Sequence, residues 1–154
     1  MKKVLNIAVK VSFVFYFLVL CIILFLGQRG HFSNLSIWEY ALMRMNIIPF
    51  KTITEYISAI FTGSMNLDIP IKNLLGNLIL FLPMGIYLPL FFKKSRKFLS
   101  FFIMMIIILL AVEIIQLFTG RGSFDIDDLI LNLSGAFIGF ALWRIKFFQK
   151  IFSK

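Results

Sequence analysis

The sequence predicts an all-α integral membrane protein with four transmembrane helices, and three observations carry this prediction. First, 60% of the 154 residues are hydrophobic and only 15% are charged, whereas soluble domains are about 45–50% apolar and about 25% charged. Second, the apolar residues gather in four runs, each long enough to cross a hydrocarbon core that needs roughly 20 residues. Third, 16 Lys and Arg outweigh 7 Asp and Glu, and most of them flank these runs. This composition excludes a soluble enzyme, a disordered tail and a disulfide scaffold.

The four expected spans form a single domain over residues 1–154. They cover residues 4–27, 71–92, 98–118 and 126–148. We interpret the first run as an uncleaved span, because it is longer than a signal-peptide core and no A-x-A-like site follows it. Cys21 lies inside this run and is expected to be an inert packing residue.

Prolines and glycines predict how the spans pack. Pro83 with Gly85, followed by Pro89, predicts a kink in the second span. Small residues let two membrane helices approach closely. We expect this role for Gly76, Gly135 and Gly139.

The basic residues predict the orientation in the membrane. The N-terminal segment carries three Lys, the connection over residues 93–97 carries four Lys and Arg, and the C-terminal segment carries four. The positive-inside rule then places both termini and this connection in the cytoplasm, with segment 28–70 and loop 119–125 outside. The same charge is expected to contact anionic membrane lipids, and we expect no nucleic-acid partner.

The outer segment 28–70 carries signals for two short helices on or in the membrane interface. Ser36-Ile-Trp-Glu39 and Thr52-Ile-Thr-Glu55 both fit the capping box, in which the first side chain caps the helix and Glu reaches back. Apolar residues recur at helical spacing after Thr52, and Gly63 is a suitable stop. An irregular apolar link over residues 46–50 joins the two helices. His31 is expected to be a solvated loop residue, and the outer segment has the character of a lid, an interfacial platform or a re-entrant element.

Polar side chains on three of the spans point to a site. A charge at the centre of a span costs roughly 2.5–3.5 kcal/mol, so such residues mark functional positions by default. Within each span they are spaced three, four or seven residues apart and therefore share a helix face. The sets are Asn73 and Asn77, Glu113 and Gln116, and Asp125, Asp128 and Asn132. Because the inner members lie about 10 Å or less from the outer ends at 1.5 Å per residue, we expect a cavity that opens outward.

These residues also have purely structural interpretations. Asp125 fits a helix N-cap, with Asp128 as the carboxylate of a capping box. Arg121 is placed to pair with either carboxylate and hold the loop. Buried amides can join helices within a membrane. Asp127 lies off the shared face and is expected to face solvent or lipid headgroups.

Four blocks of residues occur together in one order and cover nearly the whole chain. They are Asn46-Ile-Ile-Pro-Phe50, Asn73-Leu-Leu-Gly-Asn77 running on to Phe81-Leu-Pro-Met-Gly85, Glu113-x-x-Gln116, and Arg121 followed by Asp125-Ile-Asp-Asp128, Asn132 and Gly135. This set resembles the VanZ-like family, named after a membrane protein that gives low-level resistance to teicoplanin, a lipoglycopeptide antibiotic. The resemblance implies a bacterial plasma-membrane protein that lowers the effect of the antibiotic at the cell surface, and it adds Asn46 to the candidate site.

The leading hypothesis is an outward-facing protein that binds or sequesters an amphiphilic ligand. Acidic and amide side chains attract the partly cationic head of a lipoglycopeptide, and an apolar wall accepts its acyl chain.

An alternative is a membrane enzyme acting on a lipid-linked or cell-envelope substrate. Glu113 and Asp128 would serve as general acid and base, or Glu113, Asp125 and Asp128 would hold a divalent cation. The sequence contains no zinc spacing, P-loop, dinucleotide fingerprint or G-x-S-x-G elbow, so we assign no catalytic residue and expect no cofactor or metal. A third hypothesis is a small transporter, although the polar residues stop in the outer half of the spans.

Overall fold

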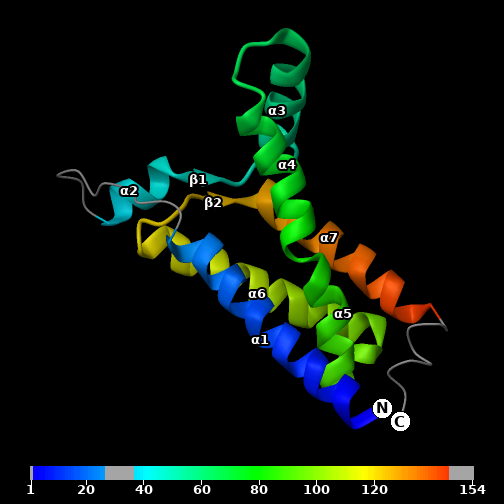
Figure 1. Cartoon of the computed structure of the whole chain (residues 1–154). Coiled ribbons are helices and arrows are strands. Elements are labelled where there is room, and N and C mark those ends of the chain that lie inside the picture. Colours follow the sequence, from blue (N-terminus) through cyan, green and yellow to red (C-terminus); the bar gives the residue numbers. More distant parts are fainter. Residues whose placement is uncertain (1, 27–36, 146–154) are drawn as a thin grey trace.

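The computed structural model describes residues 2–26 and 37–145, which are almost entirely helical (Figure 1). The elements are α1 (Lys2–Leu26), α2 (Ile37–Met43), β1 (Met45–Asn46), α3 (Lys51–Thr62), α4 (Asp68–Leu80), α5 (Leu82–Phe91), the 3-10 helix η1 (Lys93–Arg96), α6 (Phe98–Phe118), β2 (Phe124–Asp125) and α7 (Ile126–Arg144). His31, expected to be a solvated loop residue, and Ser36, expected to cap a helix, lie outside the described residues.

The predicted fold class is confirmed. Within the described residues, four helical stretches are long and apolar enough to cross a membrane, namely Val4–Leu26, Asp68–Phe91, Phe98–Phe118 and Ile126–Arg144. The third span has the predicted bounds, and the second begins three residues earlier than predicted. Beyond residue 145, the expected end of the fourth span lies outside the described residues.

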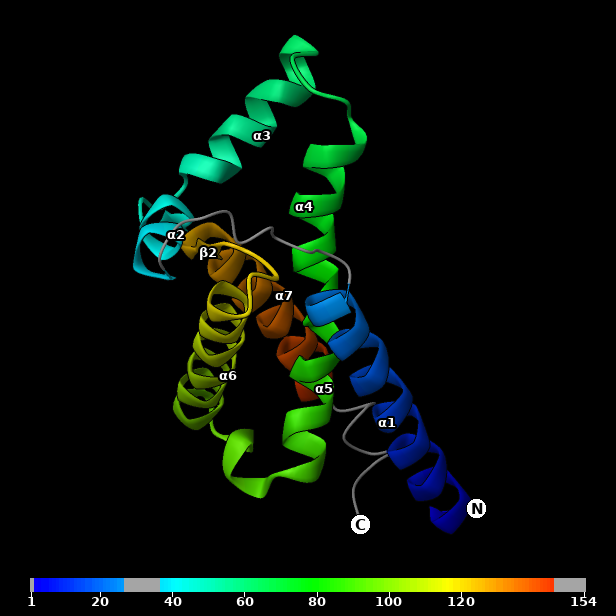
Figure 2. The same cartoon turned by 90° about the vertical axis from the view of Figure 1, so that its left-hand side faces the viewer.

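The arrangement of the helix ends agrees with the predicted topology. In Figures 1 and 2, the start of α1, the α5–α6 connection and the end of α7 lie at one end of the bundle. This end carries the basic residues of η1 and Arg144. The side of the membrane on which this end lies remains a prediction.

Aromatic and aliphatic side chains from α5, α6 and α7 form the core of the bundle. Phe101 of α6 stacks on Phe140 of α7 with 4.3 Å between the ring centroids, and both rings are buried. Helix α1 packs along the outside of this core (Figure 2) and contributes Phe13 and Tyr16, whose rings contact Tyr87. Because lipid tails are as apolar as these side chains, close packing rather than burial from water holds such helices together.

Two glycines of α7 allow close contact with the second span. A Cβ atom at Gly135 would collide with the carbonyl oxygen of Leu78, and one at Gly139 would collide with that of Leu82. The predicted close approach is confirmed at both positions. It is wrong for Gly76, because a Cβ there would meet no atom of the described residues within 4 Å.

The second span is interrupted at Phe81, between α4 and α5, as the prolines predict. Pro83 has no N–H, so it cannot donate to the carbonyl of residue 79, and its ring disfavours a continuous helix. The hydroxyl of Tyr16 on α1 donates to the carbonyl oxygen of Leu80 at 2.9 Å. The break is therefore supported from a neighbouring helix, whereas Pro89 lies inside α5 without ending it.

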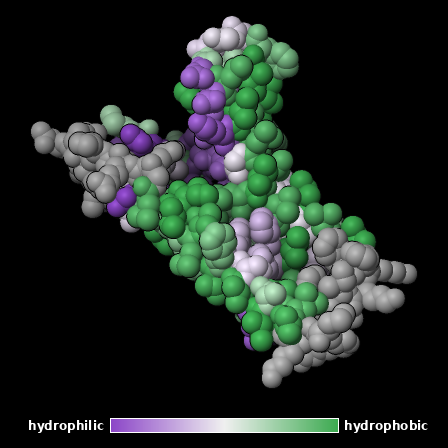
Figure 3. Space-filling view, viewed as in Figure 1, coloured by the Kyte–Doolittle hydropathy of each residue, from purple (hydrophilic) through white to green (hydrophobic). Residues whose placement is uncertain are grey.

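The two short helices predicted for segment 28–70 are present as α2 and α3, and α3 stops at Gly63 as expected, where φ is 67°. Their position at the outer membrane interface remains a prediction. Helix α3 and the first part of α4 stand beyond the rest of the bundle as a hairpin (Figures 1 and 2), whereas the end of α4 packs against α7. The hairpin is hydrophilic along one edge and hydrophobic along the other (Figure 3). The hydrophilic edge leads down toward the body of the protein, where the polar residues of the spans gather.

A short parallel pairing joins the outer segment to the start of α7. Met45 of β1 pairs with Phe124 of β2, and Asn46 pairs with Asp125. The sequence predicts an irregular link over residues 46–50. The strand pairing corrects this prediction at residue 46, the first residue of the link. The pairing brings Asn46 beside Asp125, although 79 positions separate them in the chain.

Candidate functional site

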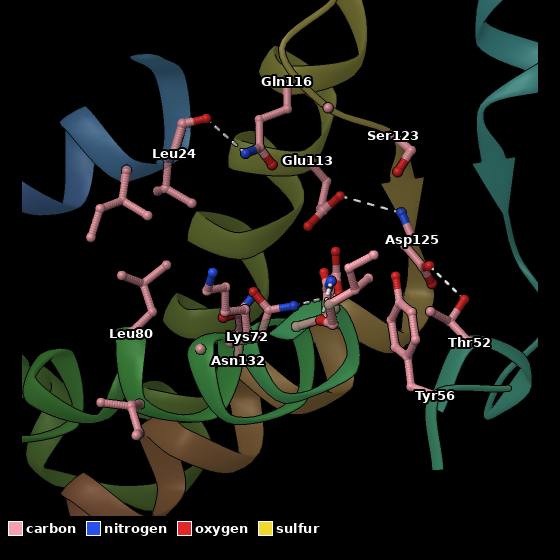
Figure 4. A pocket seen from close by; sticks show the side chains of 18 of the residues that line it. Leu24, Thr52, Tyr56, Lys72, Leu80, Glu113, Gln116, Ser123, Asp125 and Asn132 are labelled. Atoms are coloured by element: carbon pink, nitrogen blue, oxygen red, sulfur yellow. Dashed lines mark hydrogen bonds between the residues drawn. The ribbon is translucent and has the colours of Figure 1, made fainter. Parts of the chain in front are cut away.

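A cavity with a volume of about 810 Å³ lies between α1, α3, α4, α6 and the start of α7 (Figure 4). Eight of the nine residues predicted for the site line it, namely Asn73, Asn77, Glu113, Gln116, Arg121, Asp125, Asp128 and Asn132. The ninth, Asn46, lies behind the wall and donates to Asp125 at 3.0 Å and to the Thr52 hydroxyl at 2.8 Å. The structure thus brings all nine residues together.

One wall of the cavity is apolar. Ile23 and Leu24 come from the end of α1, and Ile69, Ile79 and Leu80 come from α4. Gln116 of α6 fixes the end of α1, because its amide donates to the carbonyl oxygen of Leu24 at 2.9 Å. The Gln116 amide therefore joins α6 to α1, as the structural interpretation of buried amides predicts.

The polar floor of the cavity, made of Glu113, Asp128 and Asn132, comes from α6 and α7. Glu113 is 3% exposed and Asn132 is 4% exposed, both line the cavity, and Figure 4 shows Glu113 pointing into it from α6. Glu113 Oε2 accepts the backbone N–H of Asp125 at 3.3 Å. The Asn77 amide donates to Asp128 Oδ1. The predicted capping-box role of Asp128 is therefore wrong, because Glu113 takes the backbone N–H to which Asp128 would reach back.

Asp125 joins three segments of the chain. Its carboxylate accepts the backbone N–H of Asp127 at 2.9 Å and so caps α7, as its structural interpretation predicts. The same carboxylate accepts hydrogen bonds from Asn46 and, at 2.7 Å, from the Thr52 hydroxyl. Asp125 is thus both the N-cap of α7 and part of the cavity wall.

The sequence predicts that Asp127 faces solvent or lipid headgroups, and this prediction is wrong. Asp127 is fully buried, and its carboxylate accepts the backbone N–H groups of Phe50 at 2.5 Å and of Ile53 at 3.1 Å. The first N–H groups of a helix lack partners within the helix, and they carry partial positive charge. Asp127 therefore caps α3 from α7 and fixes the base of the outer hairpin.

The capping box predicted at Thr52 is also wrong. Helix α3 begins at Lys51, after Phe50 in the left-handed conformation with a φ of 64°, and no side chain of its own caps it. The Thr52 hydroxyl instead donates across the structure to Asp125. Thr52 and Tyr56, four residues apart on one face of α3, both line the cavity. The four-residue spacing could have identified Thr52 and Tyr56 as site residues, but neither was predicted for the site.

Charged residues near the mouth of the cavity are more exposed than the floor. Lys72 pairs with Asp68 at 3.1 Å, and both side chains are largely exposed. Arg121 lines the cavity without an ion pair to Asp125 or Asp128 in the described structure, so the predicted pairing is wrong.

Two uncharged residues of the lining have other surroundings. Asn73 donates to the carbonyl oxygen of Ile69 in its own helix. Burial, together with the charges of Asp128 and Asp125, raises the pKa of Tyr56 above its ordinary value.

One buried polar atom of the floor lacks a hydrogen bond. Asn132 Oδ1 has no donor within the described part of the chain. Leaving a buried acceptor without a partner costs about 1–3 kcal/mol, so native proteins rarely do it without a reason.

Among the described residues, no group of three His, Cys, Asp or Glu is placed to hold a metal ion. This arrangement does not support the divalent-cation hypothesis for Glu113, Asp125 and Asp128.

Comparison with known proteins agrees with the four blocks of residues that meet at the cavity. The family model described as VanZ/LLP1 matches residues 13–148. The chain belongs to this VanZ-like family. It is 30% identical over 114 residues to Protein VanZ of Enterococcus faecium, a match that covers 74% of this chain and 61% of that protein. This VanZ-like chain thus spans about three fifths of the length of that relative. No solved structure matches the chain significantly.

Proposed function

We propose that this VanZ-like protein lies in the bacterial plasma membrane and binds or sequesters an amphiphilic ligand from the outer side. A lipoglycopeptide antibiotic is the leading candidate, and binding it would contribute to teicoplanin-type resistance. The observation that carries the proposal is one cavity in which an apolar wall meets a buried polar floor. Each part suits one end of an amphiphile.

The size and place of the cavity support this function. Pockets for drug-sized ligands are about 300–1,000 Å³, so a cavity of about 810 Å³ accommodates a small amphiphile or one end of a larger one. The residues of the second span that line the cavity lie between Asp68 and Leu80. They belong to the half of the bundle opposite η1. With both termini in the cytoplasm, this half faces outward and meets molecules inserted in the outer leaflet.

Direct binding tests this proposal. The purified protein in lipid nanodiscs is titrated with teicoplanin, and Glu113→Gln and Asp128→Asn are compared with the unsubstituted protein. Each substitution replaces an acidic group of the floor with a neutral amide, so we expect each to weaken binding at least tenfold and to lower resistance in cells. The matched control is Ser134→Ala, because the Ser134 hydroxyl bonds the Ile130 carbonyl within α7 and lies outside the cavity. Unchanged binding and unchanged resistance in folded Glu113 and Asp128 variants would contradict the proposal.

A membrane enzyme is the second candidate, and one observation favours it. Glu113 and Asp128 come from different helices and line the same cavity, as a general acid and base must. Mass spectrometry of teicoplanin and membrane lipids incubated with the protein separates the candidates. A new product that disappears in Glu113→Gln indicates an enzyme, whereas recovery of the unmodified molecules together with binding indicates sequestration.

A further inference from the structure

We infer that the floor of the cavity recognises a protonated primary amine at the polar end of the ligand. This inference rests on the proposed binding function and names the chemical group that the site selects. Three acceptors form the recognition site, namely Asn132 Oδ1 and the carboxylates of Glu113 and Asp128. The apolar wall beside them takes the hydrocarbon part of the same molecule.

The unpartnered oxygen of Asn132 points to a hydrogen-bond donor from outside the protein. The residue is 4% exposed, lies in the cavity lining, and has no donor for Oδ1 in the described structure. An amide oxygen has two lone pairs. A buried acceptor of this kind becomes satisfied when a ligand brings an N–H or O–H group into the cavity.

The two carboxylates add charge and spare acceptor positions. Each ionised carboxylate offers about four lone-pair positions. Within the part of the chain that the structure describes, each group has one contact, from the Asp125 backbone N–H to Glu113 and from the Asn77 amide to Asp128. Two donors that line the cavity are engaged elsewhere, since Gln116 donates to Leu24 and Lys72 pairs with Asp68. Among the described residues, neither Arg121 nor Tyr56, which also line the cavity, donates to the three acceptors.

A primary ammonium group matches this set of acceptors. It carries three N–H donors and one positive charge, and the floor presents three acceptor groups and two acidic side chains. Charge-assisted hydrogen bonds are about twice as strong as neutral ones, and the low dielectric of a buried site strengthens them further. A hydroxyl group lacks the charge, and a quaternary ammonium group lacks the donors.

Four single-chain probes of equal length separate these features. The protein in nanodiscs of zwitterionic lipid is titrated with dodecylamine, dodecyltrimethylammonium, dodecanol and dodecyl sulfate. We expect dodecylamine to bind at least tenfold more tightly than each of the other three. Equal affinity for all four would overturn the inference and leave amphiphile binding itself intact, whereas no binding of any probe or of teicoplanin would overturn both proposals.

Variants of Asn132 test the acceptor directly. Asn132→Leu is expected to weaken dodecylamine binding about tenfold and to leave dodecyltrimethylammonium binding unchanged, because only the primary amine donates to Oδ1. Asn132→Asp keeps the shape and adds a charge, so it is expected to bind dodecylamine at least as tightly as the unsubstituted protein. It remains informative even where the Leu variant fails to fold. Ser134→Ala, two residues away on α7, should bind every probe normally.

Two outcomes would contradict the role of Asn132. The first is a folded Asn132→Leu variant with unchanged affinity for dodecylamine. The second is an Asn132→Asp variant that binds dodecylamine more weakly than the unsubstituted protein. Teicoplanin binding by the same samples then shows whether only the inferred amine recognition or the wider binding function has failed.

Discussion

The half of the bundle near the basic end and the half near the cavity are held together by different forces. In the first, rings and small residues pack, as in the stacking of Phe101 on Phe140 and the contact of Gly139 with Leu82. In the second, buried carboxylates and amides join segments that are far apart in the sequence, with Asp125 and Asp127 at the centre. Because buried polar groups are costly, their gathering in this half shows that it is joined by hydrogen bonds between distant segments and not by packing alone.

The largest effect is expected where a side chain is forced between packed helices. Gly135→Leu would drive a side chain into the Leu78 carbonyl, and overpacking of this kind costs about 1–3 kcal/mol or more. We expect loss of monodisperse protein in detergent and a sharply lower Tm. Gly76→Leu is the matched control, since the space beside Gly76 is open. A similar loss of stability in both variants would show that glycine packing does not hold these helices.

The cap that α7 supplies to α3 is expected to give the next largest effect. Asp127→Ala leaves the N–H groups of Phe50 and Ile53 without their acceptor, and loss of such a helix cap costs about 0.5–2 kcal/mol. Amide hydrogen exchange over residues 50–56 should accelerate, while exchange over residues 101–109 of α6 stays slow. If α3 kept its protection, the hairpin would be held by other contacts.

A smaller effect is expected at the bond between Thr52 and Asp125. Thr52→Val removes the hydroxyl that donates to Asp125 and should cost about 1 kcal/mol of stability, a typical value for one hydrogen bond. Thr54→Val is matched in chemistry, because the Thr54 hydroxyl bonds only nearby carbonyls at the start of α3. Equal Tm values for the two variants would contradict the structural role of the Thr52 hydroxyl.

The smallest of these effects is expected at the break in the second span. Tyr16→Phe removes the donor to the Leu80 carbonyl, and hydrogen bonds between membrane helices contribute about 0.6 kcal/mol on average. Tyr87→Phe is the control, since its hydroxyl bonds the Ser12 hydroxyl at an exposed position. Thermal unfolding should distinguish the two, with the lower Tm for Tyr16→Phe, and the opposite order would show that the break needs no support from α1.

Sequence patterns predicted the features that depend on neighbouring residues. The four spans follow from local hydropathy, the interruption at Phe81 follows from Pro83, and the shared helix faces predicted which polar residues meet at the cavity. The patterns did not predict the pairing of Met45 and Asn46 with Phe124 and Asp125.

Contacts across long stretches of chain explain two of the errors. The two errors at Asp127 and Thr52 have one cause, because each residue bonds a segment more than 70 positions away. Local spacing can suggest a cap for the helix that contains it. It carries no information on a carboxylate that arrives from another helix.

The central claim is that Asn132 and its acidic neighbours are retained for a ligand rather than for the fold. Paired measurement of Tm and dodecylamine affinity for Asn132→Leu tests it most directly, because the substitution removes a buried acceptor that has no partner among the described residues. The account predicts a Tm equal to or above that of the unsubstituted protein, together with about tenfold weaker binding. A lowered Tm with unchanged dodecylamine binding would contradict it and would assign Asn132 to the fold.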